Sequence, residues 1–345
     1  MAKYSKELNY FNAFACLGVI LVHILSIGIT SLSRDSIQLF IIFLPWKISA
    51  YVVPAFLFSG AVKMALSFEG GKNENYLKYI AKRFLKIYLP YCLWVIVYYL
   101  YFLKLGWVEK GIVPLIKYIL VGDLSAQFYY VVIVMQFYIL MPLWKLFIKH
   151  VPFFIGIPFT GLITILMHKF DPLLQHLEIT FPYRSVVFVT YLAFWVVGLY
   201  VGKHYEDIKK SLKDCGGSTL LSSLFVILVT LIHYWQYSKS LYIFDGEILK
   251  FFTDILTVFT MLYLCIRIEN SGLEKIKKAL SFIHKSSFSV YLSHCLILQI
   301  VTNYLTGKGI TDIGFILIVR AISCYTIPFA LWYIWNVAKQ KALKK

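Results

Sequence analysis

Charged side chains are scarce in this sequence, and acidic ones are the scarcest. Charged residues make up 15% of the 345 residues, and 17 Asp and Glu stand against 34 Lys and Arg, for a formal net charge of +17. A soluble domain is typically about a quarter charged. The low share of charge therefore excludes an ordinary soluble globular domain.

Cysteine pairs at disulfide or metal-binding spacing are also missing. No CxxC pair occurs, and the six cysteines are scattered, mostly inside apolar runs. They are Cys16, Cys92, Cys215, Cys265, Cys295 and Cys324. We interpret all six as small packing residues, so the sequence predicts no metal site.

Long apolar runs dominate the rest of the chain, and 60% of the residues are hydrophobic. A run of about 18 or more predicts a membrane span, because only a helix satisfies its own backbone in lipid. Ten spans can be marked: 8–30, 37–66, 87–104, 127–148, 152–168, 185–203, 217–236, 250–267, 288–306 and 312–337. The first is longer than the apolar part of a signal peptide and lacks a cleavage site. The sequence thus predicts an all-α transmembrane bundle, with one membrane domain over residues 1–345.

The distribution of basic residues predicts the orientation of this bundle. Placing the N-terminus inside assigns 23 of the 34 Lys and Arg to the cytoplasmic side and nine to the outside, with Lys47 and Arg320 inside spans. This bias satisfies the positive-inside rule, so we expect both termini to be cytoplasmic and the protein to reside in the plasma membrane. The net charge then reflects topology and attraction to anionic membrane lipids, and it requires no nucleic-acid partner.

An ionisable residue inside a span is costly and therefore a functional candidate. His23 lies deep in the first span, eleven residues after Asn12. At about 100° per residue the two share one helix face, about 16 Å apart along the axis. A neutral imidazole is well suited to take a proton from a hydroxyl. A histidine that is only hydrogen-bonded within the bundle is an equally good interpretation.

Three other charged groups stand out near or within spans. Arg83 and Lys86 lie three residues apart at the start of the third span. They would either clamp the phosphates of an anionic ligand or anchor the span in the membrane surface. Asp254 is the acid well inside a span, and we expect it to form a structural ion pair with Arg320. The basic segment 269–285 is typical of an amphipathic helix on the membrane surface.

Four segments together resemble the membrane-bound acyltransferase-3 family. They are the first-span pattern that ends at His23, VPAFLFSG (53–60), KRFLKIYLPY (82–91) and SFSVYLSH (287–294). The aromatic stretch QFYYVVIVMQFYIL (127–140), which contains Gln136, is similar to the fourth span of that family. The likeness is greatest to the branch of the intercellular-adhesion polysaccharide protein of biofilm formers.

The resemblance implies transfer of an acyl group from cytosolic acyl-CoA, acetyl-CoA above all, to a hydroxyl of an extracytoplasmic glycan or lipid-linked sugar. His23 would be the general base or acyl relay. Arg83, Lys86 and Asn12 would hold the donor, while Tyr291, His294 and Gln136 would line the substrate cavity. No hydrolase domain is expected after the last span, so the glycan itself or a glycan synthase partner would meet the acyl group.

Two positions depart from the family pattern. Asn12 stands where the family has an arginine, and Lys86 replaces the second arginine of the third-span pair. Lysine keeps the charge but loses the two-pronged guanidinium, whereas asparagine removes the charge altogether. An export component for polysaccharide or lipid-linked sugar, without acyl transfer, therefore remains the alternative. A non-catalytic partner of a synthase is a third.

Overall fold

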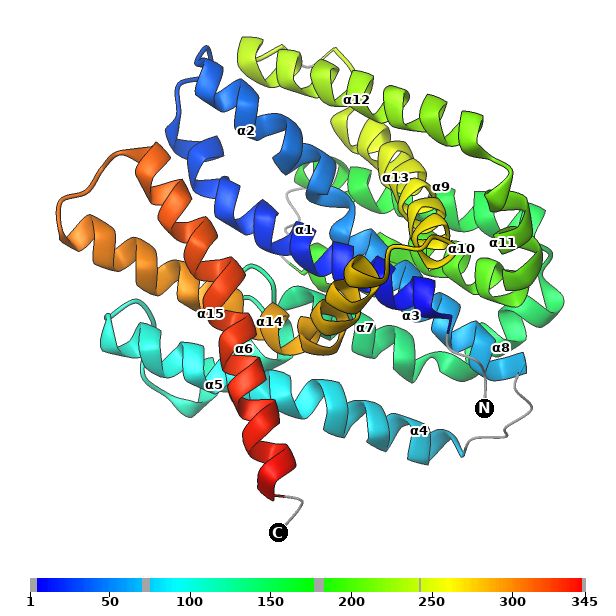
Figure 1. The fold of residues 1–345 in the computed structure, drawn as a ribbon, viewed down its shortest axis with the longest axis horizontal. Helices are drawn as coiled ribbons and strands as arrows, with labels where there is room; N and C mark the ends of the chain where they lie inside the picture. Colours follow the sequence, from blue (N-terminus) through cyan, green and yellow to red (C-terminus); the bar gives the residue numbers. More distant parts are fainter. Residues whose placement is uncertain (1–4, 70–74, 177–182, 242, 343–345) are drawn as a thin grey trace. The chain divides into compact units, whose positions relative to one another are not determined.

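The computed structural model describes residues 5–69, 75–176, 183–241 and 243–342. Those residues fold into helices and short helical turns with no strand, which confirms the all-α prediction (Figure 1). The helices of the first half are α1 (Lys6–Ser31), α2 (Ile37–Ile48), α3 (Val52–Glu69), α4 (Tyr76–Arg83), α5 (Leu89–Lys104), α6 (Ile112–Val121), α7 (Tyr129–Ile139) and α8 (Met141–His150). Those of the second half are α9 (Phe153–His176), α10 (Leu192–Lys203), α11 (Tyr205–Lys213), α12 (Gly216–Lys239), α13 (Gly246–Glu269), α14 (Glu274–Gly307) and α15 (Ile313–Ala342).

Within the described residues, seven helical stretches are long and apolar enough to cross a membrane. They are Lys6–Ser31, Ile37–Phe68, Tyr76–Lys104, Gly216–Lys239, Gly246–Glu269, Glu274–Gly307 and Ile313–Ala342. The bent pair α7 and α8 is an eighth if it counts as one span. The remaining two predicted spans coincide with shorter apolar helices, Phe153–Lys169 and Phe188–Lys203. A multi-pass membrane protein is therefore established, while the number ten stays a prediction.

Large apolar side chains cover much of the outer surface of these helices. On α12 and α15, for example, Leu221, Leu228 and Trp335 are well exposed. Soluble monomers rarely expose this much apolar surface to water, whereas a membrane-spanning helix packs such side chains against lipid tails. The exposed apolar faces thus agree with the apolar runs of the sequence.

Contacts divide the chain into two compact units. Leu57–Ile208 form the body of the first unit, and Ser5–Phe56 with Lys209–Lys345 form the second. A compact unit is not in itself a separately folding domain, so the single domain over 1–345 stays a prediction. Each unit is described below by itself.

The first unit is built around α10, whose residues are all buried except Lys203 at its end. Two glycines let its backbone approach α3 closely. A Cβ atom on Gly198 would lie 2.5 Å from the carbonyl oxygen of Phe58, and one on Gly202 would lie 2.7 Å from that of Val62. One turn before Gly198, Trp195 stacks on Phe137 with 4.3 Å between ring centroids.

The second unit is built around α1, which contacts α2, α13, α14 and α15 (Figure 1). Its first turn is fixed by an ion pair between the buried carboxylate of Glu7 and Lys209 of α11. Farther along, Gly18 allows Val52 of α3 to pack against the helix backbone. Because α1 contacts four other helices, the side chains that it directs toward α14 have a fixed position.

The basic segment 269–285 does not form a helix of its own. Its residues from Glu274 onward are the first turns of α14, which continues without a break to Gly307. The prediction that the segment is helical is confirmed from Glu274 onward, and its place on the membrane surface stays a prediction. The helix continues from this segment into SFSVYLSH (287–294). A break between the two would leave backbone N–H and C=O groups without partners, which is costly in lipid.

Candidate active site

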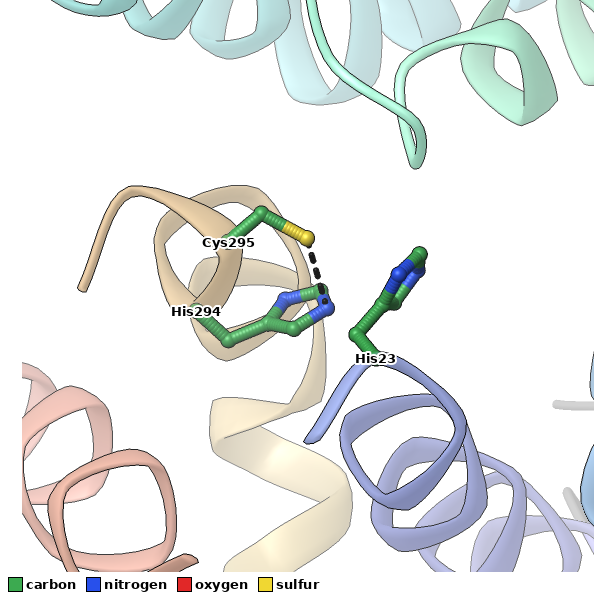
Figure 2. A group of neighbouring side chains, drawn as sticks. All are labelled: His23, His294 and Cys295. Carbon is green, nitrogen blue, oxygen red and sulfur yellow. Dashed lines mark hydrogen bonds between the residues drawn. The ribbon is translucent and has the colours of Figure 1, made fainter. Parts of the chain in front are cut away.

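His23 of α1 and the pair His294 and Cys295 of α14 lie side by side in the second unit (Figure 2). The imidazole rings of His23 and His294 are 5.2 Å apart between centroids. One nitrogen of each ring and the sulfur of Cys295 lie within 4.8 Å of one another. His294 is fully buried, whereas His23 and Cys295 are partly accessible. The structure thus brings together two histidines that are 271 positions apart in the sequence.

The hydrogen bonds of His294 fix how its ring is protonated. Its Nδ1 lies 3.1 Å from the carbonyl oxygen of Val290, one turn earlier in α14. A carbonyl can only accept, so Nδ1 carries the proton and Nε2 presents its lone pair. The sulfur of Cys295 is 3.3 Å from that Nε2, so the thiol donates to it. The neutral ring is therefore oriented as a base toward a thiol.

Tyr291 lies next to His294, three residues earlier on α14. The two ring centroids are 6.0 Å apart, and the phenol ring also packs edge-on against Phe56 at 6.2 Å. Tyr291 itself is buried. It supports the imidazole from the side, and its function as a cavity residue stays a prediction.

Arg320 of α15 is buried behind this cluster, and the prediction that it pairs with Asp254 is wrong. Its guanidinium donates to the backbone oxygen of His23 at 2.6 Å and to the hydroxyl of Thr302 at 2.8 Å. Asp254 is instead paired with Lys250, one turn earlier on α13. A partner four residues away on the same helix is reached without bringing α15 to α13. The structural ion pair of Asp254 is confirmed, but with another cation.

Asn12 lies on the same unbroken helix as His23, in agreement with the predicted stripe. Its side-chain oxygen is buried and has no hydrogen-bond donor among the described residues. A buried amide oxygen without a donor is costly. The position that departs from the family pattern therefore leaves a buried acceptor without a donor among the described residues.

Arg83 and Lys86 belong to the first unit. Arg83 is the last residue of α4, and Lys86 lies within the wider π-helical turn that follows, Phe84–Tyr88. Their joint contact with donor phosphates stays a prediction. The Arg83 guanidinium lies over the rings of Tyr79 and Tyr138, at 5.0 and 4.6 Å from their centroids. Lys86 is exposed. π-Turns inside α-helices are frequent at functional sites, but Arg83 already has two cation–π partners.

Gln136 of α7 uses both ends of its amide within the first unit. Its nitrogen donates to the carbonyl of Val186 at 2.7 Å, and its oxygen accepts from the backbone N–H of Phe188 at 3.1 Å. These bonds hold the 3-10 turns Arg184–Val186 and Phe188–Tyr191 against α7. The contacts give Gln136 a structural role, and its place in a substrate cavity stays a prediction.

A basic cavity of about 490 Å³ lies in the second unit, at the start of α1 and α14 and the end of α15. Its walls include Lys6, Lys277, Lys278 and Lys285, together with Tyr10 and Trp332. Glu274, also in the wall, pairs with Lys277 at 2.9 Å. Four ammonium groups beside two aromatic faces are suited to a phosphorylated or nucleotide-like ligand. Sequence reasoning placed these lysines on the membrane surface and missed the cavity.

The fold and the histidine cluster define a multi-pass membrane protein with two imidazoles and a thiol grouped between α1 and α14. The family model of the acyltransferase domain matches residues 5–335, which run through both units. The chain therefore belongs to the acyltransferase-3 family, and the family supports membrane acyltransferase activity. We found no match to the chain among curated proteins or among solved structures.

Replacing Arg320 tests whether its hydrogen bonds hold the cluster together. Arg320→Met removes two charge-assisted bonds, each worth about 1.5–3 kcal/mol. We expect the melting temperature of the purified protein, followed by size-exclusion chromatography after heating, to fall by about 5 °C or more. Arg267→Met, at an exposed position of α13, should leave the melting temperature unchanged. Equal melting temperatures for the two variants would contradict this role.

Proposed function

We propose that the protein transfers an acyl group, acetyl above all, from acyl-CoA on the cytosolic side to a hydroxyl of an extracytoplasmic glycan or lipid-linked sugar. Its proposed location is the plasma membrane, among membrane lipids and with a glycan synthase as a possible partner in polysaccharide O-acetylation. The observation that carries the proposal is the imidazole of His23, held inside the bundle beside a second imidazole. The acyltransferase family of the chain supports it.

His23 would act as the general base for the acceptor. Acyl transfer to an alcohol needs a group that takes the hydroxyl proton as the oxygen attacks the carbonyl carbon. His23 is half-buried as a residue, so it is not sealed completely inside the bundle. The backbone oxygen of His23 is bound by both Arg320 and the hydroxyl of Ser26, which fixes the start of the side chain. A base fixed in this way takes a proton without reorganisation of its surroundings.

The donor would be held by cations on the cytosolic side. Coenzyme A carries a diphosphate and a further phosphate at its nucleotide end, and it has amide N–H groups along its arm. Arg83 and Lys86 are the phosphate ligands that the family resemblance suggests, and the lysine-lined cavity offers a second basic surface. The buried oxygen of Asn12 would accept from an amide N–H of the arm.

Loss of the His23 imidazole tests the proposed activity. His23→Ala should lower acyl transfer by about a hundredfold or more, since a positioned general base contributes 10²–10⁴-fold. Ester groups on the surface glycan and the amount of protein in the membrane are measured together. His150→Ala, at an exposed position of α8, is the matched control and should esterify normally. Normal esterification by His23→Ala would refute the proposal, and less glycan with unchanged ester per sugar would favour the export alternative.

Binding of acyl-CoA to the purified protein distinguishes the two basic surfaces. If Arg83 holds the donor phosphates, Arg83→Ala should weaken binding by about tenfold or more, because a charge-assisted contact is worth about 1.5–3 kcal/mol. Arg83→Lys, which keeps the charge, should bind better than Arg83→Ala. The double variant Lys278→Ala, Lys285→Ala would then bind as the wild type does. The reverse pattern would move the donor site to the lysine-lined cavity.

A further inference from the structure

We propose that Cys295 is the nucleophile of the transfer, so that the acyl group passes through a thioester on the protein before it reaches the acceptor. The inference rests on the proposed acyl transfer and adds a residue that sequence reasoning had classed as packing. Its basis is the geometry of Cys295, His294 and His23, drawn in Figure 2.

Cys295 has the surroundings of an activated nucleophile. Such a residue needs a base within hydrogen-bond reach and a third group that orients the base. The sulfur is 3.3 Å from Nε2 of His294, and the carbonyl of Val290 holds the opposite nitrogen at 3.1 Å. Nucleophile, base and orienting group are therefore all present within two turns of α14.

The other cysteines with described hydrogen bonds face backbone carbonyls instead. Cys215 donates to the carbonyl of Ser211, and Cys16 and Cys324 donate to the carbonyls of Ser287 and His294 on α14. A thiol inside a helix can always turn to the carbonyl one turn back. Cys295 lies in the middle of α14 and directs its sulfur to an imidazole. Cys295 is also partly accessible, whereas Cys16, Cys265 and Cys324 are buried.

The first half of the reaction loads the thiol. As the sulfur of Cys295 attacks the thioester carbonyl of acyl-CoA, Nε2 of His294 takes the S–H proton and a new C–S bond forms. The bond between the carbonyl carbon and the CoA sulfur then breaks, and His294 returns the proton to that sulfur. The products are acyl-Cys295 and CoA with a free thiol. One thioester replaces another, so the step needs no further source of energy.

The second half of the reaction unloads the thiol onto the acceptor. The acceptor hydroxyl attacks the carbonyl of acyl-Cys295 while His23 takes its proton, and the C–S bond to Cys295 breaks. The departing thiolate then recovers that proton from the imidazolium of His23, passed on through Nε2 of His294, so both imidazoles end neutral. The products are the acyl ester and free Cys295. Two imidazoles with 5.2 Å between their centroids thus have separate tasks, one at the thiol and one at the acceptor.

Two histidines and a cysteine are also ligands of zinc. Metal content is therefore measured in the test.

The test traps the thioester on the full-length protein in detergent. Purified protein is incubated with acetyl-CoA labelled in the acetyl group, without acceptor, then denatured and separated on a gel. The wild type and His23→Ala should retain label that neutral hydroxylamine releases, as it does for thioesters. Cys295→Ala should retain none and should transfer acetyl to glycan at least about a hundredfold more slowly. Cys265→Ala, a buried cysteine away from the cluster, should label and transfer normally.

Three outcomes would overturn the inference. The first is wild-type transfer by Cys295→Ala. The second is an unlabelled wild type that still transfers acetyl. The third is stoichiometric zinc that is lost on replacing His23, His294 or Cys295. Cys295→Ser, nearly the same in shape, guards against misfolding, and any label it takes should resist neutral hydroxylamine as an oxygen ester. A wild type that neither transfers acetyl nor releases CoA would instead refute the proposed function itself.

Discussion

Polar groups inside a membrane must find their partners within the protein, because lipid offers none. In the second unit this requirement is met around α1. Arg320 binds the backbone oxygen of His23, His294 binds the carbonyl of Val290, and the thiol of Cys295 binds His294. Each bond satisfies a polar group inside the helical bundle and also fixes the position of a residue of the candidate site. The site is therefore a consequence of the same constraint that makes the chain helical.

Much of this arrangement could be predicted from the sequence, because lipid restricts the chain so strongly. The apolar runs predicted an all-α bundle, and His23 stood out since an ionisable residue in a span is rare. His294 was reached through its motif. The pairing of Asp254 was predicted with the wrong cation, because Arg320 lies on another helix and only tertiary packing decides where it points. Lys250, four residues away, satisfies the carboxylate first.

Other features depend on local geometry that a residue pattern does not contain. Neighbours in a helix do not normally face each other, so the HisCys pair at 294 and 295 gave no reason to expect contact. The thiol reaches the imidazole only because Val290 turns that ring. Likewise, the π-helical turn Phe84–Tyr88, in which Lys86 lies, replaces the regular helix that the spacing of Arg83 and Lys86 presumed. The match to the acyltransferase domain spans residues 5–335, so it includes both the HisCys pair and the π-helical turn, but a match of this kind carries no side-chain geometry.

The central claim is that this protein carries an acyl group across the membrane to a hydroxyl by means of His23. The most direct measurement places purified protein in sealed vesicles, with labelled acetyl-CoA on one side and a glycan acceptor on the other. The account predicts ester on the glycan only when acetyl-CoA faces the basic side of the protein, and none with His23→Ala. Intact, correctly inserted protein that forms no ester from either side would contradict it.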